Sequence, residues 1–173
     1  MSDVETTIRR AGEDDIAFIM SVEQLPGYAE RVGTWSKAEH TEKLEKADYA
    51  YFLCLAGEQP VGFVIFKDVG DAMGNLCLHR IAVGDAGRGV GTSFMRNLCD
   101  WAFSDAAVYR LWLDVLPGNP SARRVYGKVG FQEEGLMRSA LRYPDGRRTD
   151  LLLMSLLRPD WQAVQPTRTA VTV

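Results

Sequence analysis

One stretch of the chain, residues 81–92, constrains the fold most, because it joins a strand, a turn and a helix within one short segment. It reads IAVGDAGRGVGT. An apolar strand end is followed by glycines, and apolar side chains then recur at the spacing of one helix face, at Val90, Phe94, Leu98 and Trp101. The segment therefore predicts a strand that runs through a glycine-rich turn into an amphipathic helix.

The glycines of this turn, at positions 87, 89 and 91, leave the first N–H groups of the helix uncovered. Such N–H groups lack partners within the helix, and the helix dipole adds partial positive charge there. The turn predicts a phosphate or pyrophosphate site, although a glycine-rich loop without a ligand has the same appearance. The sequence contains no Gly-Lys-Ser/Thr triplet of a P-loop, and glycines at every second position do not fit a dinucleotide fingerprint.

The bulk composition fits one globular domain with a hydrophobic core. The chain has 173 residues, 46% of them hydrophobic, and a net charge of −3. This charge argues against a broad nucleic-acid-binding surface. No apolar run approaches the roughly 18 residues of a membrane span, and the N-terminus lacks the apolar run of a signal peptide.

The cysteines and histidines do not form a disulfide framework or a metal motif. Cys54, Cys77 and Cys99 are odd in number, far apart and set in apolar segments. His40 and His79 lack the spacing of metal ligands. We therefore expect no bound metal and a reducing, cytoplasmic location.

The N-terminal half predicts short alternating elements. We expect a strand at 6–10, a helix with Ile16, Ile19 and Met20 on its apolar face, and a second helix over 36–45 that begins with the capping box Ser36-Lys37-Ala38-Glu39. Strands at 49–56 and 61–66 form a hairpin. The intervening residues 27–35 read as a loop, in which Tyr28 and Trp35 line a pocket or pack in the core.

The C-terminal half predicts a crossover between parallel strands. A strand at 76–83, a helix at 90–104 and a strand at 110–115 follow one another. A helix capped by Asn119 begins with Pro120 and ends at Gly130, and two strands follow near 132–137 and 150–156. These elements predict a single α/β domain over residues 1–161, a mixed β-sheet with helices on both faces, and a flexible tail over 162–173.

The capped helix carries the second informative pattern, with Asn119, Ala122, Val125, Tyr126, Gly130 and Phe131 at fixed spacing. Together with the glycine turn before it, this pattern closely resembles the GNAT superfamily of N-acetyltransferases. That family has the turn Gln/Arg-x-x-Gly-x-Gly/Ala followed by N-x-x-A-x-x-L-Y-x-x-x-G-F. The closing residues resemble the branch of ribosomal-protein alanine and spermidine acetyltransferases, at Glu134-Gly135, Arg138, Asp145-Gly146, Asp150 and Met154.

The resemblance implies acetyl-CoA as cosubstrate. Its pyrophosphate would bind the turn, at Gly87, Arg88, Gly89, Val90, Gly91 and Thr92. Its pantetheine arm would pair like an added strand with Ile81, Ala82 and Val83, where a backbone N–H would also stabilise the oxyanion. Asn119, Ala122 and Arg123 would complete the site, with Arg123 near the 3′-phosphate or on a solvated helix face. Ala86 replaces the family's Gln or Arg, which we expect to weaken cofactor binding only modestly.

The resemblance also assigns catalytic roles. Tyr126 matches the family's acid, which protonates the leaving thiolate, although the same position suits a buried core tyrosine. Many family members have Glu where this chain has Cys77, and a thiol is a poor substitute. His79, two residues further along the same strand face, and Asp114, close before Asn119, are the two candidate bases. Each also has a structural interpretation, as a packed histidine and a strand-end carboxylate.

The acceptor follows from the sequence only as a class. We expect a small primary amine or amino-acid-like compound, with a protein N-terminus as the alternative and the loops at 25–35 and 138–148 as its walls. A polyamine would require an acidic cleft, for which the candidates are Glu39, Glu42, Asp71, Glu133 and Glu134. A sensor that holds acyl-CoA without turnover is the competing class. Related enzymes often pair through their sheets, which leaves a homodimer open.

Overall fold

The computed structural model of the chain describes residues 5–84 and 89–164. Its strands are β1 (Thr7–Arg10), β2 (Tyr49–Ala56), β3 (Gln59–Lys67), β4 (Asn75–Val83), β5 (Arg110–Val115), β6 (Gln132–Arg142) and β7 (Arg148–Leu157). Its helices are the 3₁₀ turn η1 (Glu13–Asp15), α1 (Ile16–Glu23), α2 (Ala29–Val32), α3 (Lys37–Leu44), α4 (Val90–Ser104), α5 (Pro120–Val129) and α6 (Arg158–Val164).

The seven strands form one mixed sheet in the order β1-β2-β3-β4-β5-β7-β6. All neighbours are antiparallel except β4 and β5, which are parallel and joined by α4. This arrangement confirms the predicted crossover and the predicted fold class. The short parallel contact lies at the middle of the sheet and divides it into two antiparallel halves.

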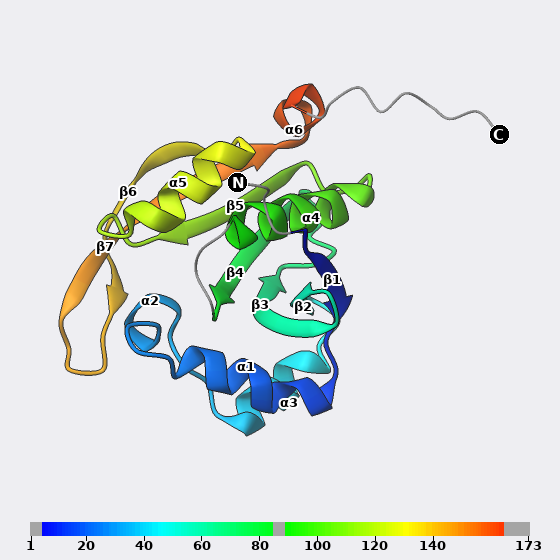
Figure 1. Cartoon of the computed structure of the whole chain (residues 1–173). Helices are drawn as coiled ribbons and strands as arrows, with labels where there is room; N and C mark the ends of the chain where they lie inside the picture. Colours follow the sequence, from blue (N-terminus) through cyan, green and yellow to red (C-terminus); the bar gives the residue numbers. More distant parts are fainter. Residues whose placement is uncertain (1–4, 85–88, 165–173) are drawn as a thin grey trace.

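Helices cover the two faces of the sheet unequally (Figure 1). α4 and α5 lie on one face, where their buried side chains join the larger core with Phe66, Leu111 and Leu156. α1 and α3 lie on the other face, against a smaller core that contains Tyr51 and Phe63. Along the central strands, successive apolar side chains point alternately into one core and the other, as expected for strands buried on both sides.

Local sequence signals explain where several helices begin and end. Ser36 caps α3, where its hydroxyl accepts the Glu39 N–H at 3.3 Å while the Glu39 carboxylate accepts the Ser36 N–H at 2.7 Å. Asn119 caps α5 through the Ala122 N–H, and Gly130 ends that helix at φ 112°. These boundaries, like those of α4, agree with the predicted ones.

Three regions differ from the prediction. The segment predicted as a loop over 27–35 contains one helical turn, α2. The last two strands are longer than predicted, because β6 and β7 pair through two register shifts into a long hairpin. α6 extends through Val164, three residues into the predicted flexible tail, and buries Trp161 against Phe103. Among the described residues, no helix is both long and apolar enough to cross a membrane.

Candidate active site

The sheet opens between β4 and β5. The two strands are paired only from Asn75 with Arg110 to Cys77 with Trp112. Beyond this point β4 continues alongside β3, while β5 continues alongside β7. In the described part of the chain, the edge of β4 from Leu78 onward therefore has no strand on its β5 side, and its outward N–H and C=O groups are not paired within the sheet.

Two of the three predicted pantetheine-binding residues present their backbone to this opening. The Gly84 N–H donates to the Val61 carbonyl on β3 at 2.7 Å. Since N–H and C=O groups of alternate residues point to opposite sides of a strand, those of Ala82 also point to β3, and those of Ile81 and Val83 point to the opening. The structure thus leaves Ile81 and Val83 as candidate partners for an added strand, whereas Ala82 is used within the sheet.

A β-bulge lies on β4 near the start of this edge. Ile65 is opposite Arg80 and Phe66 is opposite Leu78, so His79 is the extra residue. As a result, His79 and Arg80 both lie against Trp35, with ring centroids of His79 and Trp35 5.3 Å apart and the Arg80 guanidinium 3.6 Å from the indole centroid. His79 therefore lies on the side of the sheet that carries Trp35.

The helix that follows the glycine turn begins at Val90, after Gly89 in the left-handed conformation at φ 78°. No side chain of the described residues caps it. The Thr92 N–H donates to the Gly89 carbonyl at 3.1 Å, and the Thr92 side chain is buried. The amides of Val90 and Gly91 are therefore better candidates for an anion than that of Thr92. The predicted Gly87 and Arg88, and the substituted Ala86, lie outside the described residues.

Tyr126 lies on α5 in the larger core, next to Phe131. Burial, together with the charge of Asp114, raises the pKa of its phenol above the usual value, which keeps the hydroxyl protonated. Tyr126 packs on the α4–α5 side of the sheet. The Leu113 and Val115 side chains of β5 face the same core, so the Asp114 side chain between them faces the opposite side. Asp114 lies on β5 two residues beyond Trp112, the last residue of that strand that pairs with β4, and its charge acts on the Tyr126 phenol.

The two candidate bases differ in their surroundings. Desolvation raises the pKa of Asp114, and the charge of Lys67 opposes this shift. Desolvation and the positive charges of Arg80, Lys67 and Lys43 lower the pKa of His79 to about 4. The imidazole is therefore neutral at pH 7 but weakly basic, whereas the carboxylate of Asp114 is made more basic than usual. Burial also raises the pKa of Cys77 to about 12, which agrees with the prediction that its thiol is a poor base.

The remaining predicted cofactor residues lie at the start of α5. The Asn119 side-chain oxygen accepts the Ala122 N–H at 3.3 Å. The Arg123 guanidinium is held by Glu133 on β6, with a nitrogen–oxygen distance of 2.6 Å, and by the Pro117 carbonyl at 3.2 Å. An incoming phosphate would have to compete with Glu133 for the Arg123 guanidinium. The neighbouring Arg124 is exposed to solvent.

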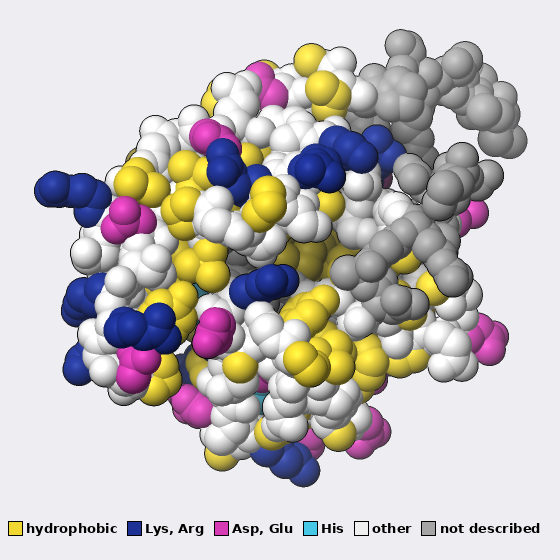
Figure 2. Space-filling model, turned by 60° about the vertical axis from the view of Figure 1, so that its left-hand side comes forward, with side chains coloured by type: hydrophobic (Ala, Val, Ile, Leu, Met, Phe, Trp, Pro, Cys, Tyr) yellow, Lys and Arg dark blue, Asp and Glu magenta, His cyan; other side chains and the backbone are white. Residues whose placement is uncertain are grey.

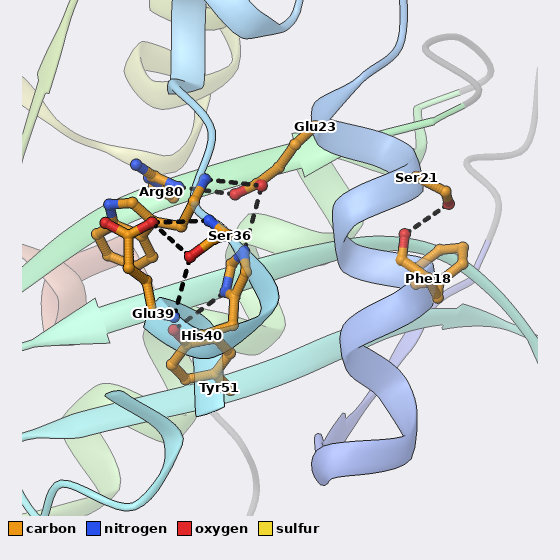
Figure 3. Close-up of polar contacts among 9 residues, drawn as sticks. Phe18, Ser21, Glu23, Ser36, Glu39, His40, Tyr51 and Arg80 are labelled. Carbon is orange, nitrogen blue, oxygen red and sulfur yellow. Dashed lines mark hydrogen bonds and ion pairs between the residues drawn. The ribbon is translucent and has the colours of Figure 1, made fainter. Parts of the chain in front are cut away.

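A buried polar network on the α1–α3 side was not predicted (Figure 3). Glu23, 1% exposed, accepts from Arg80 at 2.7 Å and contacts the His40 ring at 3.2 Å. The other nitrogen of His40 lies 3.3 Å from the Tyr51 hydroxyl. A signal existed in the sequence, because Glu23 falls on the apolar stripe of α1, seven residues after the buried Ile16. The partners lie on separate elements and have no common spacing.

The acidic residues considered for a polyamine cleft do not gather in the described structure. Glu42 pairs with Lys46 on α3, Glu133 pairs with Arg123, and Glu134 pairs with Arg110. Glu39 is part of the α3 capping box, and Asp71 accepts N–H groups within its own loop. Each carboxylate has a local partner, so these five residues do not form a common acidic wall.

A hollow lies on the face turned forward in Figure 2, with hydrophobic side chains at its base. This view brings forward the side of the molecule that carries α2 and the β6–β7 hairpin in Figure 1. Glu30 on α2 and Arg147 at the hairpin are close enough for the carboxylate to contribute to the raised pKa of that arginine. The two loops predicted as acceptor walls therefore approach each other.

Comparison with known proteins decides the family. The model of the acetyltransferase (GNAT) family matches residues 18–131 of this chain. The chain belongs to this family. The match includes the glycine turn and the helix that carries Tyr126, so both patterns identified from the sequence lie within it.

Individual relatives agree with this assignment. The "Putative ribosomal N-acetyltransferase YdaF" of Bacillus subtilis is 36% identical over 76 residues, which is 44% of this chain and 41% of that protein. This chain therefore spans less than half the length of that relative. A spermidine N-acetyltransferase from Vibrio cholerae, solved with CoA and spermine, superposes with a TM-score of 0.80 at 18% identity, over 91% of this chain and 98% of that one.

The aminoglycoside acetyltransferase AAC(6')-Ib, solved with coenzyme A and kanamycin, superposes with a TM-score of 0.76 at 20% identity. The superposition covers 94% of this chain and 100% of that one. At these identities the two structural matches establish the GNAT fold. Both matched structures contain coenzyme A.

Proposed function

We propose that the protein transfers an acetyl group from acetyl-CoA to a primary amine by direct attack. The observation that carries this proposal is the unpaired edge of β4, beside which β5 carries Asp114 beyond its last pair with β4. The charge of Asp114 acts on the Tyr126 phenol, the proposed acid. The first amides of α4, where Gly89 provides no side-chain cap, are groups of the kind that bind a pyrophosphate. Family membership supports the same cosubstrate.

The proposed reaction uses two proton transfers. The lone pair of the neutral amine attacks the thioester carbonyl carbon, and the carbonyl π electrons move to oxygen, where a β4 N–H stabilises them. When the carbonyl re-forms, the carbon–sulfur bond breaks and the thiolate takes the Tyr126 hydroxyl proton. The nitrogen loses one proton to the base and becomes an amide. Solvent then returns a proton to Tyr126.

We assign the base role to Asp114, acting through a water molecule. Its position on β5 beyond the last pair with β4 supports this role, and the raised pKa of its carboxyl group makes it a stronger proton acceptor than an ordinary aspartate. His79, with a pKa of about 4, is assigned to hold the amine or the water through its neutral ring.

The acceptor that fits best is a small, amino-acid-like amine. The charges that act on His79 are the cations Arg80, Lys67 and Lys43, and the candidate acids are occupied elsewhere. A polycation would meet repulsion here, whereas an amine that also carries a carboxylate would be attracted. A protein N-terminus is the second candidate, supported by the ribosomal relative and by the closeness of α2 and the β6–β7 hairpin.

Release of free CoA thiol in the presence of an amine panel tests the proposal. The panel should contain amino acids, spermidine, an aminoglycoside and short peptides, with acetylated products identified by mass spectrometry. We expect thiol release with amines that carry a carboxylate and little with spermidine. Binding of acetyl-CoA without thiol release from any amine would instead favour an acyl-CoA sensor, and absence of binding would exclude both.

A further inference from the structure

The segment between α1 and α3 is attached to the last residues of β4. The Tyr28 hydroxyl, at the start of α2, donates a hydrogen bond to the Val83 carbonyl. The Leu25 side chain lies 3.7 Å from the position that a Cβ atom would take on Gly84. Both contacts are made where the strand leads into the glycine turn, so the segment touches the part of β4 that the proposed function assigns to acetyl-CoA.

The carbonyl that Tyr28 uses belongs to the unpaired edge. Val83 presents its backbone groups to the opening between β4 and β5, as the Gly84–Val61 hydrogen bond requires. Pairing of a pantetheine arm with this edge uses outward C=O groups as acceptors for the amide N–H groups of the ligand. Tyr28 therefore donates to a carbonyl that the cosubstrate would also use as an acceptor.

The other end of the same segment is held by the buried network. The Trp35 N–H donates to the Glu23 carboxylate at 3.4 Å, and the Arg80 guanidinium packs 3.1 Å from the Cβ position of Gly33. Glu23 and Arg80 are themselves buried and paired. This end is thus fixed by buried polar contacts, whereas the Tyr28 end is held by the Tyr28 hydrogen bond to β4 and by apolar packing of Leu25 and Tyr28.

We propose that Tyr28 is a latch between the two substrate sites, a positioning residue that rests on the proposed function. Its hydroxyl holds the Val83 carbonyl and keeps residues 24–32 against β4. When the pantetheine amide of acetyl-CoA takes that carbonyl, the Tyr28 hydroxyl leaves it. The segment then loosens beside Trp35 and His79, where the amine must enter.

This arrangement makes two consequences measurable. A ligand that must displace an existing hydrogen bond binds more weakly than one that finds the acceptor free, so the latch lowers the affinity for CoA. By linkage, CoA and the closed segment disfavour each other to the same degree. A ligand without a pantetheine arm does not compete with Tyr28.

Calorimetry with CoA and with adenosine 3′,5′-bisphosphate, which lacks the arm, tests the first consequence. The variants are Tyr28→Phe, which keeps the ring, and Tyr109→Phe as a matched control at an exposed tyrosine next to the start of β5. We expect Tyr28→Phe to bind CoA about three- to tenfold more tightly and to bind the bisphosphate unchanged. The control variant should match the wild type with both ligands.

Hydrogen exchange tests the second consequence. In the wild type, saturating CoA should speed hydrogen exchange of the amides at 24–32. Without ligand, the same amides should exchange faster in Tyr28→Phe than in the wild type. Unchanged or weaker CoA binding by Tyr28→Phe, or slower or unaltered exchange of this segment on binding CoA, overturns the latch while the proposed function stands. Failure of the wild type to bind CoA overturns the proposed function itself, and the latch with it.

Discussion

The two faces of the sheet hold different halves of the candidate site. One half consists of backbone groups and the other of side chains. On the α4–α5 side, the expected cosubstrate contacts are backbone groups: the first amides of α4 and the outward edge of β4. On the α1–α3 side, the site is made of side chains around Trp35, supported by the buried pair of Glu23 and Arg80. A backbone site depends on local chain geometry, whereas the side-chain site depends on packing between distant elements.

Loss of the Tyr126 hydroxyl should have the largest effect and tests the backbone half. Tyr126→Phe is expected to lower kcat by about 10²–10⁴-fold, because the thiolate would leave without an acid. Acetyl-CoA affinity should stay near the wild-type value, since binding relies on main-chain groups. Steady-state kinetics and calorimetry measure the two quantities, and wild-type turnover in this variant would remove the acid assignment.

Removal of the Glu23 charge tests the side-chain half. Glu23→Gln should lower the free energy of unfolding by about 3–5 kcal/mol, because it leaves Arg80 buried without a counter-charge. Denaturant unfolding measures the change. Glu42→Gln, which breaks the exposed pair with Lys46, is the matched control and should leave the midpoint unchanged. Equal effects of the two substitutions would show that the network does not stabilise this face.

Substitution of the two candidate bases separates their roles. Asp114→Asn should lower kcat/KM by about 10–10²-fold and remove the acidic limb of the pH–rate profile. In the wild type that limb arises as Asp114 becomes protonated, and its raised pKa moves the limb to higher pH than for an ordinary aspartate. His79→Ala should keep the limb. A limb that persists in Asp114→Asn and disappears in His79→Ala would reverse the assignment.

The smallest predicted effect concerns stability in acid. The pKa of His79 is about 4 in the folded protein, whereas an unperturbed histidine has a pKa of about 6.5, so between these pH values only the unfolded chain binds the extra proton. Stability is fully present above pH 6.5 and falls as the pH is lowered towards 4. After allowance for the exposure of the ring, the loss should be about 1 kcal/mol. Unfolding at pH 7 and pH 4.5 measures it, and His79→Gln should have a shallower slope.

Backbone features of the fold were largely predictable from the sequence. The bounds of α4 and the caps of α5 follow from glycine, asparagine and proline, whose preferences act within a few residues. The single turn of α2 and the added length of β6 were missed, because their ends depend on tertiary contacts and register shifts. The Glu23–Arg80 pair was missed because nothing within either element indicates a partner 57 positions away.

The bulge at His79 has a consequence for the shape of the whole domain. Leu76 and Leu78 face α4 before it, Ile81 and Val83 do so after it, and the ladder with β3 continues on both sides. The bulge takes up one extra residue, so the side chains before and after it stay on the same face of β4. A bulge of this kind also bends its strand, and this one follows closely after the last pair that β4 makes with β5. A shortened β4 lacking His79 would retain both hydrophobic cores, yet it would have no local reason to diverge from its parallel neighbour. The separation of β4 from β5 would then depend on a single amino acid.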